Sequence, residues 1–389
     1  MAESYVIGVD FGSDSVRALI VNTETGENVG QGVACYPRWK AGLYQHPEYS
    51  IFRQHPLDYL ESLEKCITTA LAELTEEQKD HVIGIGVDTT GSTPVPVDKN
   101  GTPLALLDEF AENENAMFFL WKDHAAAAEA DEINKLFRNN SENDYTKYQG
   151  DYSAEWYWAK ILYAVRHDEA IRQAAYTWEE HCDWMTGILC GETRPEKIYH
   201  SACAAGHKAL WHSEWNGLPA ASVLEQLDPY LVQVRERYGN APQPSTVKVG
   251  TLCPEWAKKL GLKESTVISG SSFDAHAGAV GAGIQKKTFV CTMGTSCVDM
   301  FVEKPENLKG KDIQAYCGQA ENSILPGYVG VETGQAAFGD IFAWFKRLLE
   351  WPLTELAADE NSGISDELYK KVEDRILVML QKKAEELPE

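Results

Sequence analysis

The sequence lacks three features that would each point to a different class of protein. Among its 389 residues no apolar run approaches the length of a membrane-spanning helix, and the N-terminal segment MAESYVIGVD has no basic stretch followed by an apolar one. Basic residues are outnumbered, with 35 Lys and Arg against 59 Asp and Glu, for a net charge of -24. This charge argues against a nucleic acid or an anionic membrane as partner, because both attract Lys and Arg.

The sequence contains cysteines, but their number and spacing do not indicate disulfide pairs. The chain has 9, an odd number, and none forms a C-x-x-C pair, so we expect reduced thiols rather than a disulfide framework or a zinc site. Such thiols indicate a cytoplasmic protein. The length is more than one typical domain needs, and a hydrophobic content of 44% is ordinary for a globular protein with a large core. Two domains are therefore predicted.

The stretch YVIGVDFGSDSVRALIVN, residues 5–22, predicts two strands around a tight turn. Asp10 lies in the first, apolar strand, where an unpaired carboxylate is costly, so we expect a cation partner. The turn at residues 12–15 can direct backbone N–H groups at an anion. Arg17 beyond the turn favours a phosphate over a neutral ligand. A plain hairpin is the alternative interpretation.

The following residues predict an α/β fold, because strands alternate with a helix. A third strand is expected at 27–36, a loop at 36–56, an amphipathic helix at 58–74, and strands at 82–87 and 95–97. Residues 116–183 are helical in pattern and rich in tryptophan, which we interpret as core. A proline-rich stretch leads to a domain junction near residue 265.

The pattern of the opening stretch returns after residue 265. A strand ends in polar and small residues before a helix, and a second hairpin at 289–302 surrounds Gly294-Thr295-Ser296. We interpret this as an internal repeat that directs a second anion-binding turn at the same cleft. Helices are predicted at 334–349 and 368–380. About 120 residues follow the junction, at the low end of domain size, so the second domain is expected to be incomplete.

Seven motifs together resemble the FGGY family of carbohydrate kinases. They are DFGSDSVRALIV at 10–21, GVDTTGSTPVPVD at 86–98, FFLWKDHAA at 118–126, GHKALWH at 206–212, GSSFDAHAGAVGAG at 270–283, TMGTS at 292–296 and VETGQAAFGDIFAWF at 331–345. The resemblance spans essentially the whole chain. It implies duplicated α/β domains of the actin-like ATPase (ribonuclease H-like) fold, with an N-terminal domain at 1–265 and a partial C-terminal domain at 266–389.

The resemblance implies a reaction: ATP-dependent phosphorylation of a ketopentose. The expected substrate is L-ribulose, converted to L-ribulose 5-phosphate in L-arabinose catabolism, and xylulose is the alternative sugar. Full-length relatives continue with a glycine-rich turn that holds the adenosine, and we find no such segment. A non-catalytic or weakly active sugar-binding fragment is therefore the alternative function. Whether the protein forms a homodimer is left open by the sequence.

The resemblance also assigns roles to carboxylates. Asp274 is the general base that accepts the hydroxyl proton as the phosphoryl group transfers. A helix N-cap is the alternative for this residue, since Asp is favoured there. Asp10, and with less support Asp88, are assigned to Mg2+, which takes few protein carboxylates and keeps several waters. A capped turn is the alternative for both.

The remaining site residues are assigned in the same way. The ATP phosphates are expected to contact Gly12, Ser13, Arg17, Gly294, Thr295 and Ser296. The sugar is expected to contact Asp274 together with Ser92, Thr93, Trp121, Lys208 and Glu332. Three histidines, His124, His207 and His276, show no metal-ligand spacing with a third ligand, and we interpret them as structural or as supporting a neighbouring group.

Overall fold

The computed structural model describes residues 3–294, 297–308, 311, 318–335, 337–359 and 362–387. The chain divides into two compact units. One comprises residues 1–290 and 300–333, and the other comprises 291–299 and 334–389. This division reflects which residues contact one another in space. It does not test the domain boundary predicted near residue 265, which stays a prediction.

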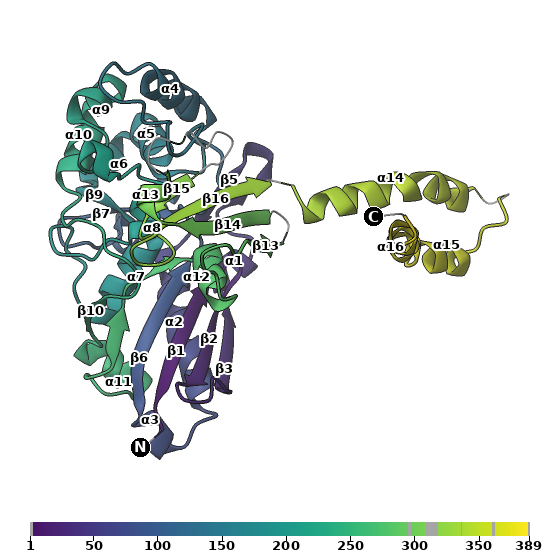
Figure 1. Ribbon diagram of the computed structural model, residues 1–389, viewed down its shortest axis with the longest axis horizontal. Helices are drawn as coiled ribbons and strands as arrows, with labels where there is room; N and C mark the ends of the chain where they lie inside the picture. Colours follow the sequence, from purple (N-terminus) through teal and green to yellow (C-terminus); the bar gives the residue numbers. More distant parts are fainter. Residues whose placement is uncertain are drawn as a thin grey trace. The chain divides into compact units, whose positions relative to one another are not determined.

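A seven-stranded sheet organises the first unit. Its path is β10-β11-β6-β1-β2-β3, and β12 pairs with β6 beside this path. Figure 1 shows β6, β1, β2 and β3 side by side in this order. The strands are β1 (Tyr5–Phe11), β2 (Ser15–Asn22), β3 (Asn28–Cys35), β6 (Val82–Thr89), β10 (Lys248–Thr251), β11 (Val267–Ser269) and β12 (Ser272–Phe273). β1, β2 and β3 are antiparallel, whereas β6 runs parallel to β1, β11 and β12. The opening hairpin and the strands predicted at 27–36 and 82–87 are confirmed.

Helix α2 (Pro56–Leu71) covers this sheet and confirms the amphipathic helix predicted at 58–74. Its buried Leu63, Cys66 and Ile67 join the core formed by the alternate, inward side chains of β1. The approach to β3 is close: a Cβ atom at Gly32 would lie 2.1 Å from the carbonyl oxygen of Cys66. Glycine at this position therefore sets the distance between the helix and the sheet.

The segment predicted as a loop at 36–56 contains regular structure instead. It forms α1 (Pro37–Lys40), β4 (Gln45–His46), the 3-10 helix η1 (Pro47–Tyr49) and β5 (Ile51–Gln54). β5 pairs with β4 and with the distant β8 (Phe118–Phe119). Arg53 in β5 is fully buried, donates to Asp123, and lies 3.5 Å above the ring of Phe119. These long-range partners order the segment, and local sequence does not reveal them.

The middle of the chain is mainly helical. It contains α4 (Ala127–Arg138), α5 (Tyr157–His167), α6 (Glu169–Ala174), α7 (His181–Cys190), α8 (Ala202–His207), α9 (Ala221–Leu227), α10 (Pro229–Glu236) and α11 (Pro254–Leu260). The two-stranded sheet of β7 (Pro94–Val97) and β9 (Thr177–Glu180) interrupts the helical pattern predicted at 116–183. Trp156, Trp158 and Trp178 are buried in one cluster, so their interpretation as core is confirmed.

The rest of the first unit carries α12 (Asp274–Gly281), the short α13 (Pro305–Leu308), β15 (Gly318–Glu321) and most of β16 (Val329–Gln335). β15 and β16 are antiparallel, with Gly318 opposite Glu332. β13 (Val290–Met293) and β14 (Cys297–Glu303) flank residues 294–296, as the predicted second hairpin requires. Thr295 and Ser296 lie outside the described residues.

The second unit contains α14 (Gly339–Ala358), α15 (Asp366–Glu373) and α16 (Ile376–Glu385). The prediction of a helix at 334–349 was wrong at both ends, because residues 334 and 335 still belong to β16 and the helix continues through Pro352. The single helix predicted at 368–380 is two helices. The N–H of Arg375 donates to Val372, three residues back, and this tight turn closes α15.

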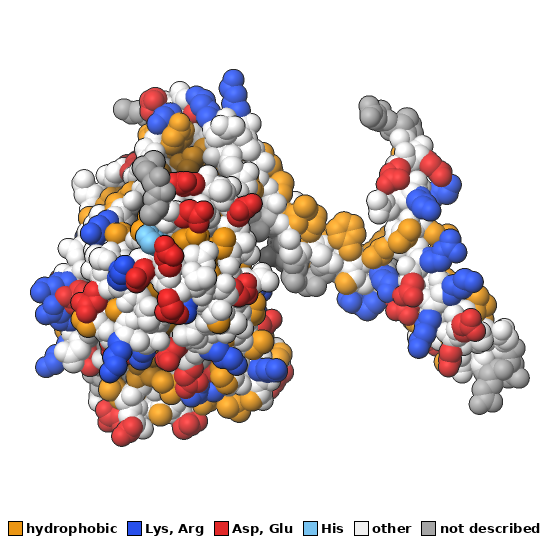
Figure 2. Space-filling view, turned by 90° about the horizontal axis from the view of Figure 1, so that it is seen from below, with side chains coloured by type: hydrophobic (Ala, Val, Ile, Leu, Met, Phe, Trp, Pro, Cys, Tyr) orange, Lys and Arg blue, Asp and Glu red, His pale blue; other side chains and the backbone are white. Residues whose placement is uncertain are grey.

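The surface agrees with the acidic composition. On the face shown in Figure 2, acidic and basic side chains are interspersed over the larger unit rather than gathered into one basic patch. Within the described residues, no helix has both the length and the apolar character that crossing a bilayer requires.

Candidate active site

Strand pairing brings three carboxylates to one edge of the central sheet. Asp10 in β1 lies opposite Asp88 in the parallel β6. β12 pairs with β6 so that Ser272 lies opposite Asp88, and α12 begins at Asp274 two residues later. The carboxyl ends of parallel strands meet at one edge, where α/β proteins bind their ligands. All three predicted acidic residues are therefore neighbours.

The charges of these groups are only partly compensated. Burial, and then the charges of Asp10 and Asp274, hold the pKa of Asp88 well above its ordinary value. Burial raises the pKa of Asp274 to about 6, and the charge of Asp10 adds to this effect, against the opposing hydrogen bond from the N–H of Ala275. Arg17, which the sequence assigned to phosphate, donates to Asp10 over 2.8 Å and so provides Asp10 with a cation partner. An excess of carboxylate oxygens fits a hard divalent ion such as Mg2+.

Asp274 is the first residue of α12 and does not occupy its N-cap position, which is Phe273. Its carboxylate accepts the adjacent N–H of Ala275 over 2.7 Å. A hollow of about 260 Å3 on the same side of the sheet is lined by Asp88, Ser272 and Ala277 among others. The cap alternative for Asp274 is thus wrong.

The first predicted phosphate turn is held rigidly by side chains from other segments. Gln54 donates to the carbonyl of Ser13 over 2.7 Å, and the indole N–H of Trp121 donates to the Ser13 hydroxyl over 2.8 Å. Tyr36 donates to the carbonyl of Gly12 over 3.1 Å. The N–H of Gly12 itself donates to the carbonyl of Ser15 and closes the turn. The turn therefore already uses this N–H, and the assignment of Gly12 to phosphate stays a prediction.

The second predicted phosphate turn belongs to the second unit. There the carbonyl of Gly294 accepts the N–H of Gly339, at the start of α14, over 3.2 Å. With Thr295 and Ser296 outside the described residues, the assignment of this turn to phosphate stays a prediction.

Two predicted sugar residues form a buried ion pair. Lys208 follows α8, and its Nζ lies 2.8 Å from Oε1 of Glu332 in β16. The same Nζ lies 4.9 Å from the centre of the Trp156 ring. Burial acts to raise the pKa of Glu332, but the charge of Lys208 holds it well below its ordinary value. The carboxylate is therefore ionised and can accept hydrogen bonds from hydroxyl groups.

The segment Ser92-Thr93, also predicted for the sugar, is held by two buried residues that sequence reasoning missed. Glu180 accepts hydrogen bonds from the Ser92 hydroxyl and, over 2.9 Å, from the N–H of Thr93. Lys160 donates to the carbonyl of Ser92 over 2.7 Å and to that of Leu120 over 2.8 Å. The sequence did not reveal either role, because the partners of Lys160 and Glu180 lie in distant segments of the chain.

The histidines of the sequence have different surroundings. His124 lies 2.6 Å from Glu155 and is half exposed. His207 and His276 are fully buried, and their ring centres lie 4.6 Å apart. They come from α8 and α12, so their spacing along the chain gave no indication of this contact.

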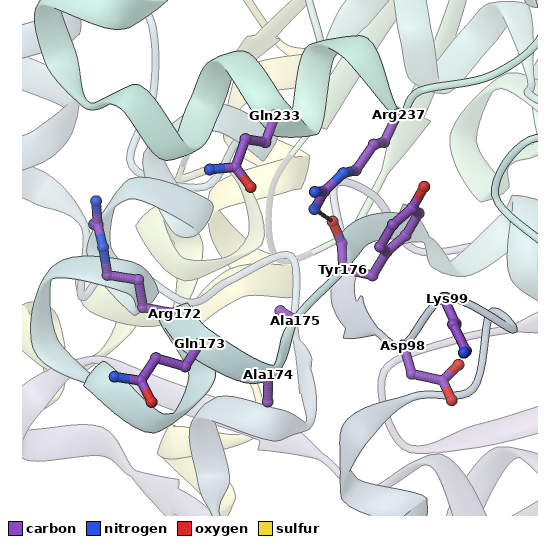
Figure 3. A pocket seen from close by; sticks show the side chains of 9 residues that line it. All are labelled: Asp98, Lys99, Arg172, Gln173, Ala174, Ala175, Tyr176, Gln233 and Arg237. Atoms are coloured by element: carbon purple, nitrogen blue, oxygen red, sulfur yellow. Dashed lines mark hydrogen bonds between the residues drawn. The ribbon is translucent and has the colours of Figure 1, made fainter.

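A second hollow, of about 440 Å3, lies away from all of these residues. It is lined by Asp98, Lys99, Arg172, Gln173, Ala174, Ala175, Tyr176, Gln233 and Arg237 (Figure 3). Its arginines are engaged already. Arg172 forms two hydrogen bonds with Asp228, and Arg237 donates to the carbonyl of Tyr176 over 2.6 Å. No predicted site residue lines it.

Comparison with known families covers nearly the whole chain. The sequence model of the N-terminal domain of the FGGY family of carbohydrate kinases matches residues 5–281, and that of the C-terminal domain matches residues 289–387. A ribulokinase of Vibrio parahaemolyticus is 46% identical over 385 residues, 99% of this chain and 68% of that protein. A ribulokinase of Shouchella clausii is 35% identical over 353 residues, 88% of this chain.

The chain is shorter than these relatives, spanning 68% of the first and 60% of the second. Among solved structures, the xylulose kinase of Rhodospirillum rubrum has a TM-score of 0.70 at 18% identity and covers 99% of this chain and 67% of its own. The glycerol kinase of Plasmodium falciparum with ADP has a TM-score of 0.68 at 14% identity, covering 92% and 64%. The predicted α/β fold of the actin-like ATPase type is confirmed.

Replacement of the buried lysine tests the Ser92 clamp. Lys160→Met leaves the carbonyls of Ser92 and Leu120 buried without a donor, so we expect a loss of about 2–4 kcal/mol in the free energy of unfolding, measured by denaturant titration. The backbone N–H of Thr93 should also exchange faster with solvent. The matched control is Lys135→Met, on the exposed face of α4, for which a change within about 0.5 kcal/mol is expected. Equal stability of the two variants would contradict the clamp.

Replacement of one carboxylate tests the electrostatic strain at the sheet edge. The ordinary pKa of Asp is 3.8, and the pKa of Asp88 in the folded state is raised well above it. At pH values between the two, the folded state therefore binds more protons than the unfolded state. Stability therefore falls as the pH rises through this window, and the loss persists at neutral pH. Without divalent ions, Asp88→Asn should melt a few degrees higher than the native chain at pH 7 but not at pH 4. The exposed control Asp131→Asn should show no such difference, and a lower melting temperature for Asp88→Asn at pH 7 would refute the strain.

Proposed function

Since this chain belongs to the FGGY family of carbohydrate kinases, we propose that it transfers the γ-phosphoryl group of ATP to a hydroxyl of L-ribulose, giving L-ribulose 5-phosphate and ADP. Ribulokinases matching up to 99% of this chain support the choice of sugar. The observation that carries the proposal is the meeting of Asp10, Asp88 and Asp274 at one edge of the sheet. L-Arabinose catabolism is the pathway that such a reaction would serve.

Asp274 acts as the general base in this proposal. A base works best when its pKa lies close to the working pH, because it is then both deprotonated and strong enough to accept a proton. A pKa of about 6 meets that condition better than the ordinary value of 3.8. The carboxylate accepts the hydroxyl proton of the sugar as the oxygen attacks the phosphorus.

The sugar is oriented by groups that are already fixed before it binds. Lys208 donates and Glu332 accepts, so the pair offers both hydrogen-bonding roles to neighbouring hydroxyls. Ser92 and Thr93 present backbone groups held by Glu180 and Lys160. Trp121 presents an indole that is tied to the phosphate turn through Ser13. Preorganisation of this kind lowers the entropic cost of reaching the reactive geometry.

Asp10 and Asp88 would hold Mg2+, mainly through water molecules, and the ion supplies neutralisation of the phosphate charge. Arg17, half exposed beside Asp10, is the fixed cation that we assign to the phosphates. Ser13, Gly294, Thr295 and Ser296 complete this assignment. We place the protein in the cytoplasm, in keeping with free thiols at the described cysteines.

A variant of the base tests the proposed reaction. ADP release should depend on added ketopentose, and Asp274→Asn should lower kcat by about 10²–10⁴-fold, since it keeps the shape of the side chain but cannot accept the proton. Asp131→Asn is the matched control and should retain full activity. Undiminished turnover in Asp274→Asn would reject this base. Calorimetric binding of the sugar without turnover in the native chain would favour the alternative of a sugar-binding fragment.

The pH dependence provides an independent test. A base with a pKa of about 6 is protonated below that pH, so kcat/KM should fall about tenfold for each pH unit below 6 and level off above it. The falling limb reports the interacting carboxylates of Asp88 and Asp274 together rather than one of them. A profile that stays flat down to pH 4.5 would be incompatible with a base of this kind.

A further inference from the structure

Two buried histidines and a buried cysteine form a compact cluster beside the proposed sugar site. Cys203 and His207 lie in α8, and His276 lies in α12. One donor atom from each lies within 4.8 Å of the others. Glu332 adjoins the cluster, with its Oε2 3.0 Å from Nε2 of His276 and 3.9 Å from Nδ1 of His207. All four side chains are at least nine-tenths buried.

The imidazole nitrogens of this cluster lack hydrogen bonds of acceptable geometry, although His276 forms an ion pair with Glu332. Among the described residues, neither ring nitrogen of His207 or of His276 makes a hydrogen bond of acceptable geometry. The 3.0 Å approach of His276 to Glu332 is an ion-pair distance without that alignment. A buried polar group without a partner costs roughly 1–3 kcal/mol. Four such nitrogens in one place indicate a ligand that would satisfy them.

We propose that Cys203, His207, His276 and Glu332 form a binding site for a zinc-class divalent ion. A thiolate, two imidazoles and a carboxylate are the donors that Zn2+ takes in four-coordinate sites, and they disfavour Mg2+, which takes oxygen. With bonds of about 2.0–2.3 Å, the donors of such a site lie roughly 3.3–3.7 Å apart. The donor atoms of Cys203, His207 and His276 lie within 4.8 Å of one another, so they would have to approach by about 1 Å to reach this spacing.

The site has a consequence for the sugar, which rests on the proposed function. Glu332 directs Oε1 to Lys208 and Oε2 to the two histidines. An ion bound at Oε2 would neutralise the carboxylate and repel the ammonium group of Lys208. Glu332 would then be a weaker acceptor for a sugar hydroxyl. The ion is therefore an inhibitor of sugar binding, separate from the Mg2+ assigned to Asp10 and Asp88.

Cobalt(II) is the probe for the site, because it replaces zinc and reports its ligands by absorption. We expect the metal-free full chain to bind one equivalent of Co2+, with the strong visible bands of a tetrahedral site and a thiolate-to-cobalt charge-transfer band, both bleached by one equivalent of Zn2+. Cys203→Ser should lose the charge-transfer band. The matched control is Cys182→Ser, since Cys182 is buried in the same small apolar cluster as Cys203. An unchanged spectrum in Cys203→Ser would overturn the site, as would no thiolate band in the native chain.

A second variant and a sugar measurement complete the test. His207→Asn, confirmed as folded by its cooperative melting, should weaken Zn2+ binding at least tenfold, and unchanged affinity would count against the site. By calorimetry, one equivalent of Zn2+ should raise the Kd of L-ribulose at least tenfold in the native chain but not in Cys203→Ser. Equal effects in both would reject the link to the sugar. If L-ribulose does not bind the metal-free chain at all, the proposed function fails while the cobalt spectra still decide the metal site.

Discussion

Parallel pairing of β6 with both β1 and β12 is the constraint on which the candidate site depends. The register places Asp10 opposite Asp88 and starts α12 at Asp274, two residues beyond the contact of Ser272 with Asp88. Successive side chains of a strand point to opposite faces, so a slip by one residue would turn one carboxylate away from the others. The hydrophobic alternation of β1, buried at Ile7 and Val9, fixes this register. The same apolar pattern that builds the core therefore assembles the charged site.

Two buried lysines hold the groups that surround these carboxylates. Lys160 extends from α5 to the carbonyls of Ser92 and Leu120 and so joins the helical region to the segment between β6 and β7. Lys208 pairs with Glu332 and joins α8 to β16. Burial lowers the pKa of Lys160 to about 7, which shows that its charge is held at a cost. Each ammonium fixes segments that are distant in sequence, a role that an apolar side chain of the same size would not fill.

The sequence predicts those parts of the structure that local pattern determines. The opening hairpin, α2 and the strand that contains Asp88 follow from periodicity. It does not predict β5, whose order depends on the contact of Arg53 with Asp123 some 70 residues away. The roles of Lys160 and Glu180 are hidden for the same reason, since their partners lie in other segments. Sequence spacing likewise gave no indication that His207 and His276 lie together, because they belong to α8 and α12.

Glu332 contacts both Lys208 of the proposed sugar site and the histidines of the proposed metal-binding cluster. The carboxylates at the sheet edge offer only hard oxygen donors, whereas the cluster of Cys203, His207 and His276 offers sulfur and nitrogen. Glu332 faces Lys208 with one oxygen and the histidines with the other, so its charge is shared between the ion pair and the cluster. Because β16 and α8 place it there through backbone pairing and helix packing, neither neighbour can change its charge without affecting the other. Any ligand of the cluster must therefore alter the electrostatics of the Lys208 ion pair.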